Sequence, residues 1–149
     1  MYINMTELVK FLIVIFIVSF ICDIILNILA HTKYVYSKLS IIKSLQSYFD
    51  KYNFIVSGIN AGLTVVVATI ITILISKITF NFVIPRTYNT LIKFLSIAFI
   101  VGYLVDFVIY KCSIFGTSLD EYYVKTGTRA GILGGFSFLI AIIITYIFL

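Results

Sequence analysis

Two aspartates inside long apolar stretches are the residues of this sequence best suited to chemistry. Asp23 and Asp106 are both surrounded by Ile, Val, Leu and Phe. A carboxylate that faces lipid is costly, so such a residue normally faces a bundle interior, a polar partner or a water-filled cavity. There it either binds a proton or cation, or accepts hydrogen bonds from a neighbouring helix. We therefore expect both carboxylates to point into the protein.

Further polar residues recur near each aspartate at helical spacing. A repeat of four residues places side chains along one side of a helix. In the first apolar stretch the residues with this spacing are Ser19, Asp23, Asn27 and His31. Around Asp106 the same spacing reaches Tyr110. These side chains are candidates for a polar or ion site near one face of the bilayer.

A basic partner for the carboxylates is present at the start of the last apolar stretch. Arg129 is the only arginine near the level of either aspartate. We expect it to pair with Asp106 or Asp23, because a buried carboxylate needs compensation. Asn60 occupies the matching place in the first half and is expected to act as a neutral equivalent.

The aspartates belong to an internal repeat. When the chain is shifted by 83 positions, Leu8–Asp23 lies over Leu91–Asp106 with eight identical residues of sixteen. Apolar identities alone mean little, but a Lys and an Asp held thirteen residues apart are shared by both copies. A G-x-x-A-G sequence also occurs twice, at 58–62 and 127–131. The sequence therefore predicts two copies of a helix–loop–helix unit.

The composition assigns the chain to a membrane. Of its 149 residues 62% are hydrophobic, and the mean hydropathy is +1.15. Four apolar runs are long enough to cross about 30 Å of hydrocarbon: Leu8–Ala30, Phe54–Ser76, Leu91–Tyr110 and Ala130–Leu149. We predict an all-α membrane protein with four transmembrane helices, arranged as two helical hairpins in parallel orientation. Repeat one covers residues 1–76, a connection covers 77–90, and repeat two covers 91–149.

Two connecting segments leave alternatives open. Within Lys77–Asn89, apolar and polar residues alternate before Pro85, which indicates either a short strand or an interfacial loop. His31–Asn53 carries apolar residues at helical spacing with lysines opposite, which indicates an amphipathic helix on the bilayer surface or a plain solvated connector.

Small residues predict close helix packing in the second and fourth apolar runs. Glycines spaced by four allow helix backbones to approach in lipid. The candidate packing glycines are Gly58, Gly62, Gly127, Gly131, Gly134 and Gly135. The pattern fits packing within one chain and also fits association with a second copy or with other membrane or capsid proteins.

The distribution of charge gives an orientation and excludes some partners. The net charge is +5, with no block of Lys and Arg, so a lipid bilayer is the expected partner and nucleic acid is not. Seven Lys and Arg residues follow the first and third runs, and four lie on the opposite side. This bias predicts cytoplasmic hairpin loops. Cys22 and Cys112 form no C-x-x-C sequence, so we expect no metal or other cofactor.

A segment near the last helix carries a family resemblance. The stretch 110–123, YKCSIFGTSLDEYY, reads K-x-x-I-F-G-x-x-L-x-x-Y-Y and precedes a Gly-rich helix start. In these features it resembles small multi-pass membrane proteins of nucleocytoplasmic large DNA viruses. The resemblance implies a viral or virion membrane setting without implying an activity.

Three functions come into question for these residues. A structural or assembly role in a membrane requires no chemistry, and it is the interpretation we favour. The alternative is a small cation or proton channel or transporter that uses Asp23 and Asp106. Enzyme activity is not expected, because the G-x-G-D and P-A-L sequences of intramembrane aspartyl proteases are absent.

Overall fold

Four helices form the described part of the chain. A computed structural model describes residues 4–31, 54–112 and 127–149, and contains α1 (Met5–His31), α4 (Phe54–Phe80), α5 (Tyr88–Cys112) and α7 (Gly127–Phe148). No strand occurs among these residues. The all-helical prediction is therefore confirmed for this part. The amphipathic helix predicted within His31–Asn53 lies outside it.

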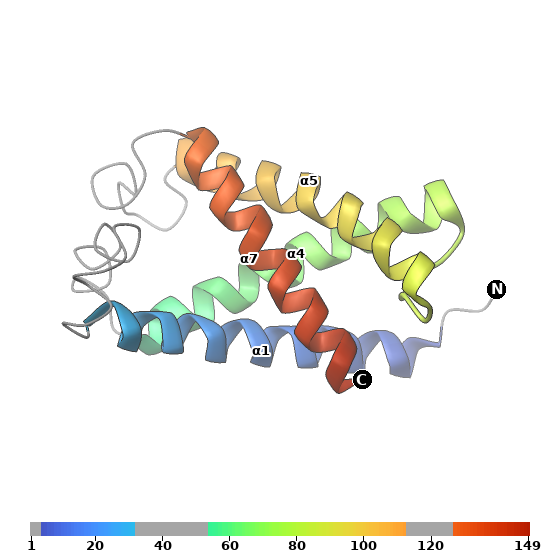
Figure 1. Cartoon of the computed structure of the whole chain (residues 1–149), viewed down its shortest axis with the longest axis horizontal. Helices are drawn as coiled ribbons and strands as arrows, with labels where there is room; N and C mark the ends of the chain where they lie inside the picture. The colour runs from blue at the N-terminus through green and yellow to red at the C-terminus, as the bar shows by residue number, and fades with distance from the viewer. Residues whose placement is uncertain (1–3, 32–53, 113–126) are drawn as a thin grey trace.

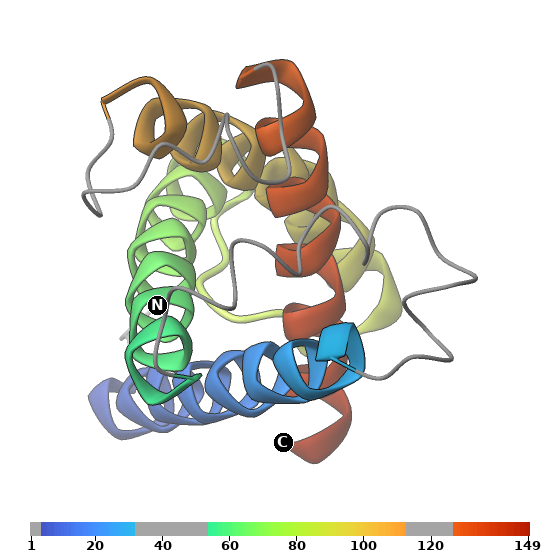
Figure 2. The same cartoon turned by 90° about the vertical axis from the view of Figure 1, so that its left-hand side faces the viewer.

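The helices form a ring. α1 packs against α4 and α7, and α5 packs against the same two helices. Figure 2 shows this ring end-on, with α1 and α5 on opposite sides. In Figure 1, α1 and α5 run in one direction, and α4 and α7 run back. His31, Phe54, Cys112 and Gly127 therefore mark one end of the bundle.

Local hydrogen bonds explain where helices begin and end. The Asn4 side chain accepts a hydrogen bond from the Thr6 N–H at 3.2 Å, which caps α1. At the end of α4, Asn81 has a positive φ of 57° and its N–H donates to the Lys77 carbonyl at 3.1 Å. Asparagine tolerates this left-handed conformation better than most residues. The Thr87 hydroxyl accepts from the Thr90 N–H at 3.3 Å at the start of α5.

Three helices are long and apolar enough to cross a membrane, over Met5–Ile25, Gly58–Phe80 and Tyr88–Ile109. The apolar part found in α7 is shorter, Gly134–Phe148. Large apolar side chains also cover the outside of all four helices, including Ile17, Val67, Ile100 and Ile140. Such a surface suits lipid rather than water.

The connection between α4 and α5 folds into the end of the ring. The strand alternative for this segment is wrong, because α4 continues through Phe80 and residues 81–87 form no regular element. Phe82, Val83 and Ile84 pack against the buried core, and Pro85 is buried. In Figure 2 the yellow-green connection is visible across the inside of the ring.

An ion pair fastens this connection to α1. The Arg86 guanidinium lies 2.6 Å from the Glu7 carboxylate, and both side chains are about half exposed or more. The Thr90 hydroxyl also accepts hydrogen bonds from the N–H groups of Arg86 and Thr87, at 3.1 and 3.0 Å. The connection is therefore fixed at both helices that begin at this end.

Candidate polar and helix-packing site

The carboxylate of Asp106 lies between α5 and α7. Asp106 is partly buried, and a Cβ added to Gly134 of α7 would coincide with its carboxylate. The Asp106 Cβ would lie 2.7 Å from the same added atom, so a change of the carboxylate rotamer alone would not make room. Gly134 therefore provides the space in which Asp106 fits. A polar group at this interface is shielded from lipid.

Two further glycines in each hairpin allow its two helices to pack closely. On α4, Gly58 and Gly62 lie against the rings of Phe20 and Phe16, with nearest distances from an added Cβ of 2.8 and 2.7 Å. On α7, Gly131 and Gly135 lie against the rings of Tyr103 and Phe99, at 2.6 and 2.9 Å. Each described hairpin thus packs two glycines, one turn apart, on two aromatic rings, one turn apart.

This shared contact changes the alignment of the second helices. Phe16 and Phe20 correspond to Phe99 and Tyr103 by the shift of 83. Their glycine partners then pair Gly58 with Gly131 and Gly62 with Gly135, a shift of 73. Aligning the two G-x-x-A-G sequences gives a shift of 69, one helical turn away. The equivalence expected between Asn60 and Arg129 does not hold in the contact alignment, which pairs Asn60 with Leu133.

The shift of 73 also matches residues that sequence reasoning missed. Ala68 and Thr72 fall on Ala141 and Thr145, and all four are buried. Each threonine hydroxyl donates to the carbonyl of its alanine, at 2.8 Å in α4 and 2.7 Å in α7. The signal that could have found this match was present in the sequence as two A-x-I-I-T segments, at 68–72 and 141–145.

Corresponding residues of the two halves meet inside the ring. Phe11 and Phe94 correspond by the shift of 83, and their rings contact edge to face with centroids 6.2 Å apart. Both are buried, with exposed fractions of 1% and 0%. Such a contact is what the predicted repeat would give if its two units faced each other across a twofold axis.

Several hydroxyl groups of α1 and α4 donate hydrogen bonds to carbonyls of their own helices. Thr69 donates to the Val65 carbonyl at 2.7 Å, and Ser19 donates to the Ile15 carbonyl at 2.8 Å. Thr64 donates to the Asn60 carbonyl at 2.8 Å. Bonds of this kind satisfy a hydroxyl without water. Among the described side chains, the Ser76 hydroxyl is buried without a partner.

Several predicted site residues are placed on helices without a description of their side chains. Asn27 and His31 lie in α1, Tyr110 in α5, and Gly127 and Arg129 in the first turn of α7. The predicted Arg129 ion pair therefore stays a prediction. Asp23 is partly buried on α1, and the contact alignment sets Ala61 at the place that Gly134 has for Asp106.

No metal site is evident in the part of the chain that the structure describes. It contains no group of three or more His, Cys, Asp or Glu side chains that could hold an ion. Cys22 and Cys112 are free thiols, the first partly buried and the second exposed.

Comparison with known proteins gives no relative. No protein-family model matches the chain, and neither a curated protein nor a solved structure matches it.

Proposed function

We propose that this chain is a multi-pass membrane protein with a structural or assembly role, which crosses the bilayer four times as two repeated hairpins. The matched glycine–aromatic contacts of α1–α4 and α5–α7 support the repeat. The apolar outer surface of α7 supports a fourth crossing, although its apolar part is shorter than the other three.

The contact of Phe11 with Phe94 carries the preference for a structural role over conduction. The two aromatic side chains are buried between α1 and α5, inside the ring of four helices. The connection beyond them packs Phe82 against Phe94, with centroids 6.4 Å apart. The hydroxyls of Thr69 and Thr72 are bonded to their own helix. A cation path needs a continuous row of water or polar groups, and the buried rings of Phe11 and Phe94 interrupt the polar groups of the described interior.

The setting follows from the sequence. The resemblance of residues 110–123 to small viral membrane proteins makes a viral or host membrane part of the proposal. The Lys and Arg bias favours cytoplasmic hairpin loops. In this setting Asp106 serves as a polar contact between α5 and α7 rather than as a transport site.

Reconstitution tests the proposal. The purified protein is incorporated into liposomes, its retention is checked by alkaline carbonate extraction, and proton and K⁺ flux are measured. We expect retained protein with flux no greater than empty liposomes, both for wild type and for Asp23→Asn with Asp106→Asn. Wild-type flux that disappears in the double variant would establish conduction instead. Loss of the protein from the membrane pellet would refute the membrane assignment itself.

A further inference from the structure

The glycines of α7 would allow this helix to pack on α5 in a second position. Gly131 lies on the ring of Tyr103, and Gly135 lies on the ring of Phe99. Gly127 precedes Gly131 by four residues, so the three glycines form one row along α7. If α7 moved by four residues, Gly127 would take the place of Gly131, and Gly131 would take that of Gly135. The movement is a slide of about 6 Å along the helix axis with a rotation of about 40°.

The first hairpin shows that this second arrangement can pack. Its G-x-x-A-G sequence, 58–62, places two glycines on two aromatic rings and includes Ala61. The slide would bring the G-x-x-A-G sequence of α7, 127–131, into the same relation to its own rings. Slides of one helical element past another by one turn occur in switching proteins. The segment 113–126 is long enough for either position, because about 6 Å is less than the reach of two extended residues.

Asp106 distinguishes the two positions. In the described position it lies beside Gly134, where an added Cβ would coincide with the carboxylate. After the slide the residue at this place would be Ala130, which has a Cβ. The carboxylate would then lose its space between the two helices, and with it the shielding from lipid. Asp106 therefore favours the described position over the second one.

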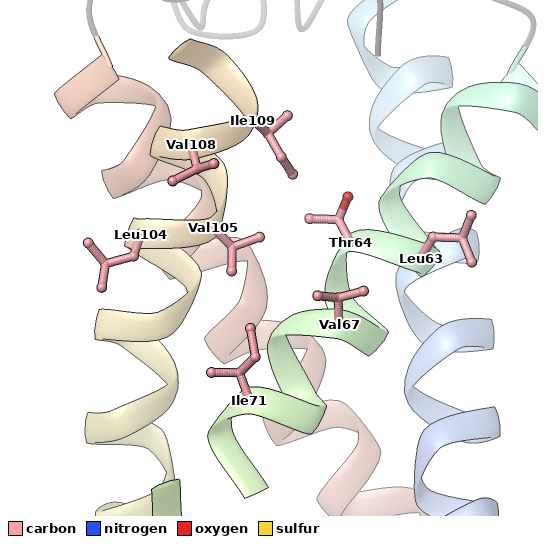
Figure 3. Close-up of a pocket in the computed structure, with 8 residues that line it drawn as sticks. All are labelled: Leu63, Thr64, Val67, Ile71, Leu104, Val105, Val108 and Ile109. Atoms are coloured by element: carbon pink, nitrogen blue, oxygen red, sulfur yellow. The ribbon is translucent and has the colours of Figure 1, made fainter. Parts of the chain in front are cut away.

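The side of α5 that faces α4 offers no comparable constraint. Figure 3 shows Val105 and Ile109 pointing toward α4, across a groove of about 540 Å³. Seven of the eight residues that line this groove are aliphatic. Aliphatic side chains replace one another readily when helices shift, whereas a single buried polar residue can fix the register of packed helices.

We propose that Asp106 selects the register in which α7 packs on α5, by occupying the space that Gly134 leaves. Asp106 is then a positioning residue, whose role goes beyond a polar contact between two helices. This role explains why the contacts of the second hairpin differ by one turn from those that its G-x-x-A-G sequence predicts. It also gives a reason for the additional glycine of α7.

Moving the space by one turn tests the proposal. The exchange variant, Ala130→Gly with Gly134→Ala, does this and keeps the composition of α7. We expect α7 to slide toward the end of the bundle that carries the connection, so that the new glycine lies beside Asp106. Phe138 opposes this slide, because it is buried and lies on Gly102. The exchange variant thus sets the requirement of the carboxylate against that of the core.

The distance between two spin labels measures the slide. Tyr88→Cys lies at the start of α5 and Ile132→Cys lies near the start of α7, at opposite ends of the bundle. Both native residues are exposed, at 80% and 41%, and the native Cys22 and Cys112 are replaced by alanine. Pulsed electron double resonance in liposomes should show a distance about 5 Å shorter in the exchange variant. The change is slightly smaller than the slide because the labels are on different helices.

Three controls separate the slide from other changes. The contact alignment pairs Ile59 of α4 with Ile132, and the exposed fraction of both is 41%, so the distance from Tyr88→Cys to Ile59→Cys should stay constant. In an Asp106→Gly background the exchange should not shorten the first distance, because no carboxylate then needs the space. Ala130→Gly alone gives Asp106 room in both registers, so it should add a minor population with the shorter distance.

Other results would overturn the proposal. An unchanged distance in the exchange variant would show that the packing of Phe138 sets the register. An equal shortening in the Asp106→Gly background would show that the glycine row moves without the carboxylate. If the exchange variant does not fold, the Ala130→Gly variant decides, and a single distance at the wild-type value would exclude a register set by Asp106.

Discussion

The two hairpins share their packing but differ at their carboxylates. In α1–α4 and in α5–α7, two glycines one turn apart lie on two aromatic rings. At Asp106 a third glycine, Gly134, leaves room for the side chain. In the contact alignment the residue that corresponds to Gly134 is Ala61, which has a Cβ.

Small residues on the second helices therefore have two structural roles, which look alike in the sequence. Helix approach depends on the glycines that both hairpins have, because ring and backbone would otherwise collide. Placement of a carboxylate between helices depends on one further small residue, which differs between the hairpins. Asp23 and Asp106 thus correspond in sequence, but the aligned residues on the second helices, Ala61 and Gly134, differ.

The largest predicted effect is at Gly134. Gly134→Ala should lower the free energy of unfolding by about 3 kcal/mol, the upper part of the usual cost of overpacking, since the new methyl group coincides with the Asp106 carboxylate. Ala61→Gly in the other hairpin should lower the free energy of unfolding by about 1 kcal/mol, because glycine has a lower helix propensity than alanine. Unfolding in mixed micelles with increasing dodecyl sulfate measures both.

A double-mutant cycle sharpens this comparison. If Asp106 causes the collision, Gly134→Ala should cost less than half as much in an Asp106→Gly background, which removes the Asp106 Cβ as well as the carboxylate. Equal costs in both backgrounds would mean that Gly134 acts through helix flexibility and not through its contact with Asp106.

The contact between the halves should give the next largest effect. Phe94→Ala should destabilise the protein by about 2.5 kcal/mol, because it leaves a cavity of roughly 100 Å³ at about 24 cal/mol per Å³, while the transfer contribution is small for a helix that unfolds into lipid. Phe11→Ala should cost a similar amount. Since the two rings touch, the double variant should cost less than the sum in the same unfolding assay.

A smaller effect should distinguish the shared glycine contacts. An added Cβ at Gly131 lies 2.9 Å from the Tyr103 carbonyl oxygen, whereas at Gly58 it lies 3.3 Å from that of Phe20. Backbone yields less readily than a ring, so Gly131→Ala should cost about 2 kcal/mol and Gly58→Ala about 1. Thermal denaturation in detergent ranks the two, and the reverse order would argue against backbone contact as the cause.

The smallest effect is expected at the ion pair of the connection. Arg86→Gln should lower stability by about 0.5 kcal/mol at most, because both partners are exposed. The difference from wild type should disappear in 1 M salt. A loss that persists in high salt would show that Arg86 holds the connection by packing.

Composition and hydropathy predicted the helical class and the approximate helices well. The first run was placed at Leu8–Ala30 and the helix extends over Met5–His31. Such boundaries depend on caps like Asn4, which lie outside the apolar run. The connection was harder to predict, since the alternation of Ile78, Phe80 and Phe82 fits a strand, whereas the helix of α4 continues to Phe80.

The alignment of the second helices by sequence differs from the alignment by contact for another reason. Ile, Val and Leu replace one another freely on helices in lipid, so identities among them carry little information. The two G-x-x-A-G sequences were the most visible match, and they pair Gly58 with Gly127 and Gly62 with Gly131. The contacts instead pair Gly58 with Gly131 and Gly62 with Gly135, one helical turn further along. The space that Gly134 leaves for Asp106 was not predictable, because it depends on how closely α5 and α7 approach.

The contact of Phe11 with Phe94 has a consequence for the substitutions that such a protein can accept. In a dimer of identical hairpins, one mutation would alter both sides of this contact together. A single chain that carries both copies has no such restriction. One turn further, Ile15 corresponds to Ala98, and both are fully buried. Under the proposed duplication, the joining of both hairpins in one chain would thus let a large residue on one side fill the room left by a small residue on the other.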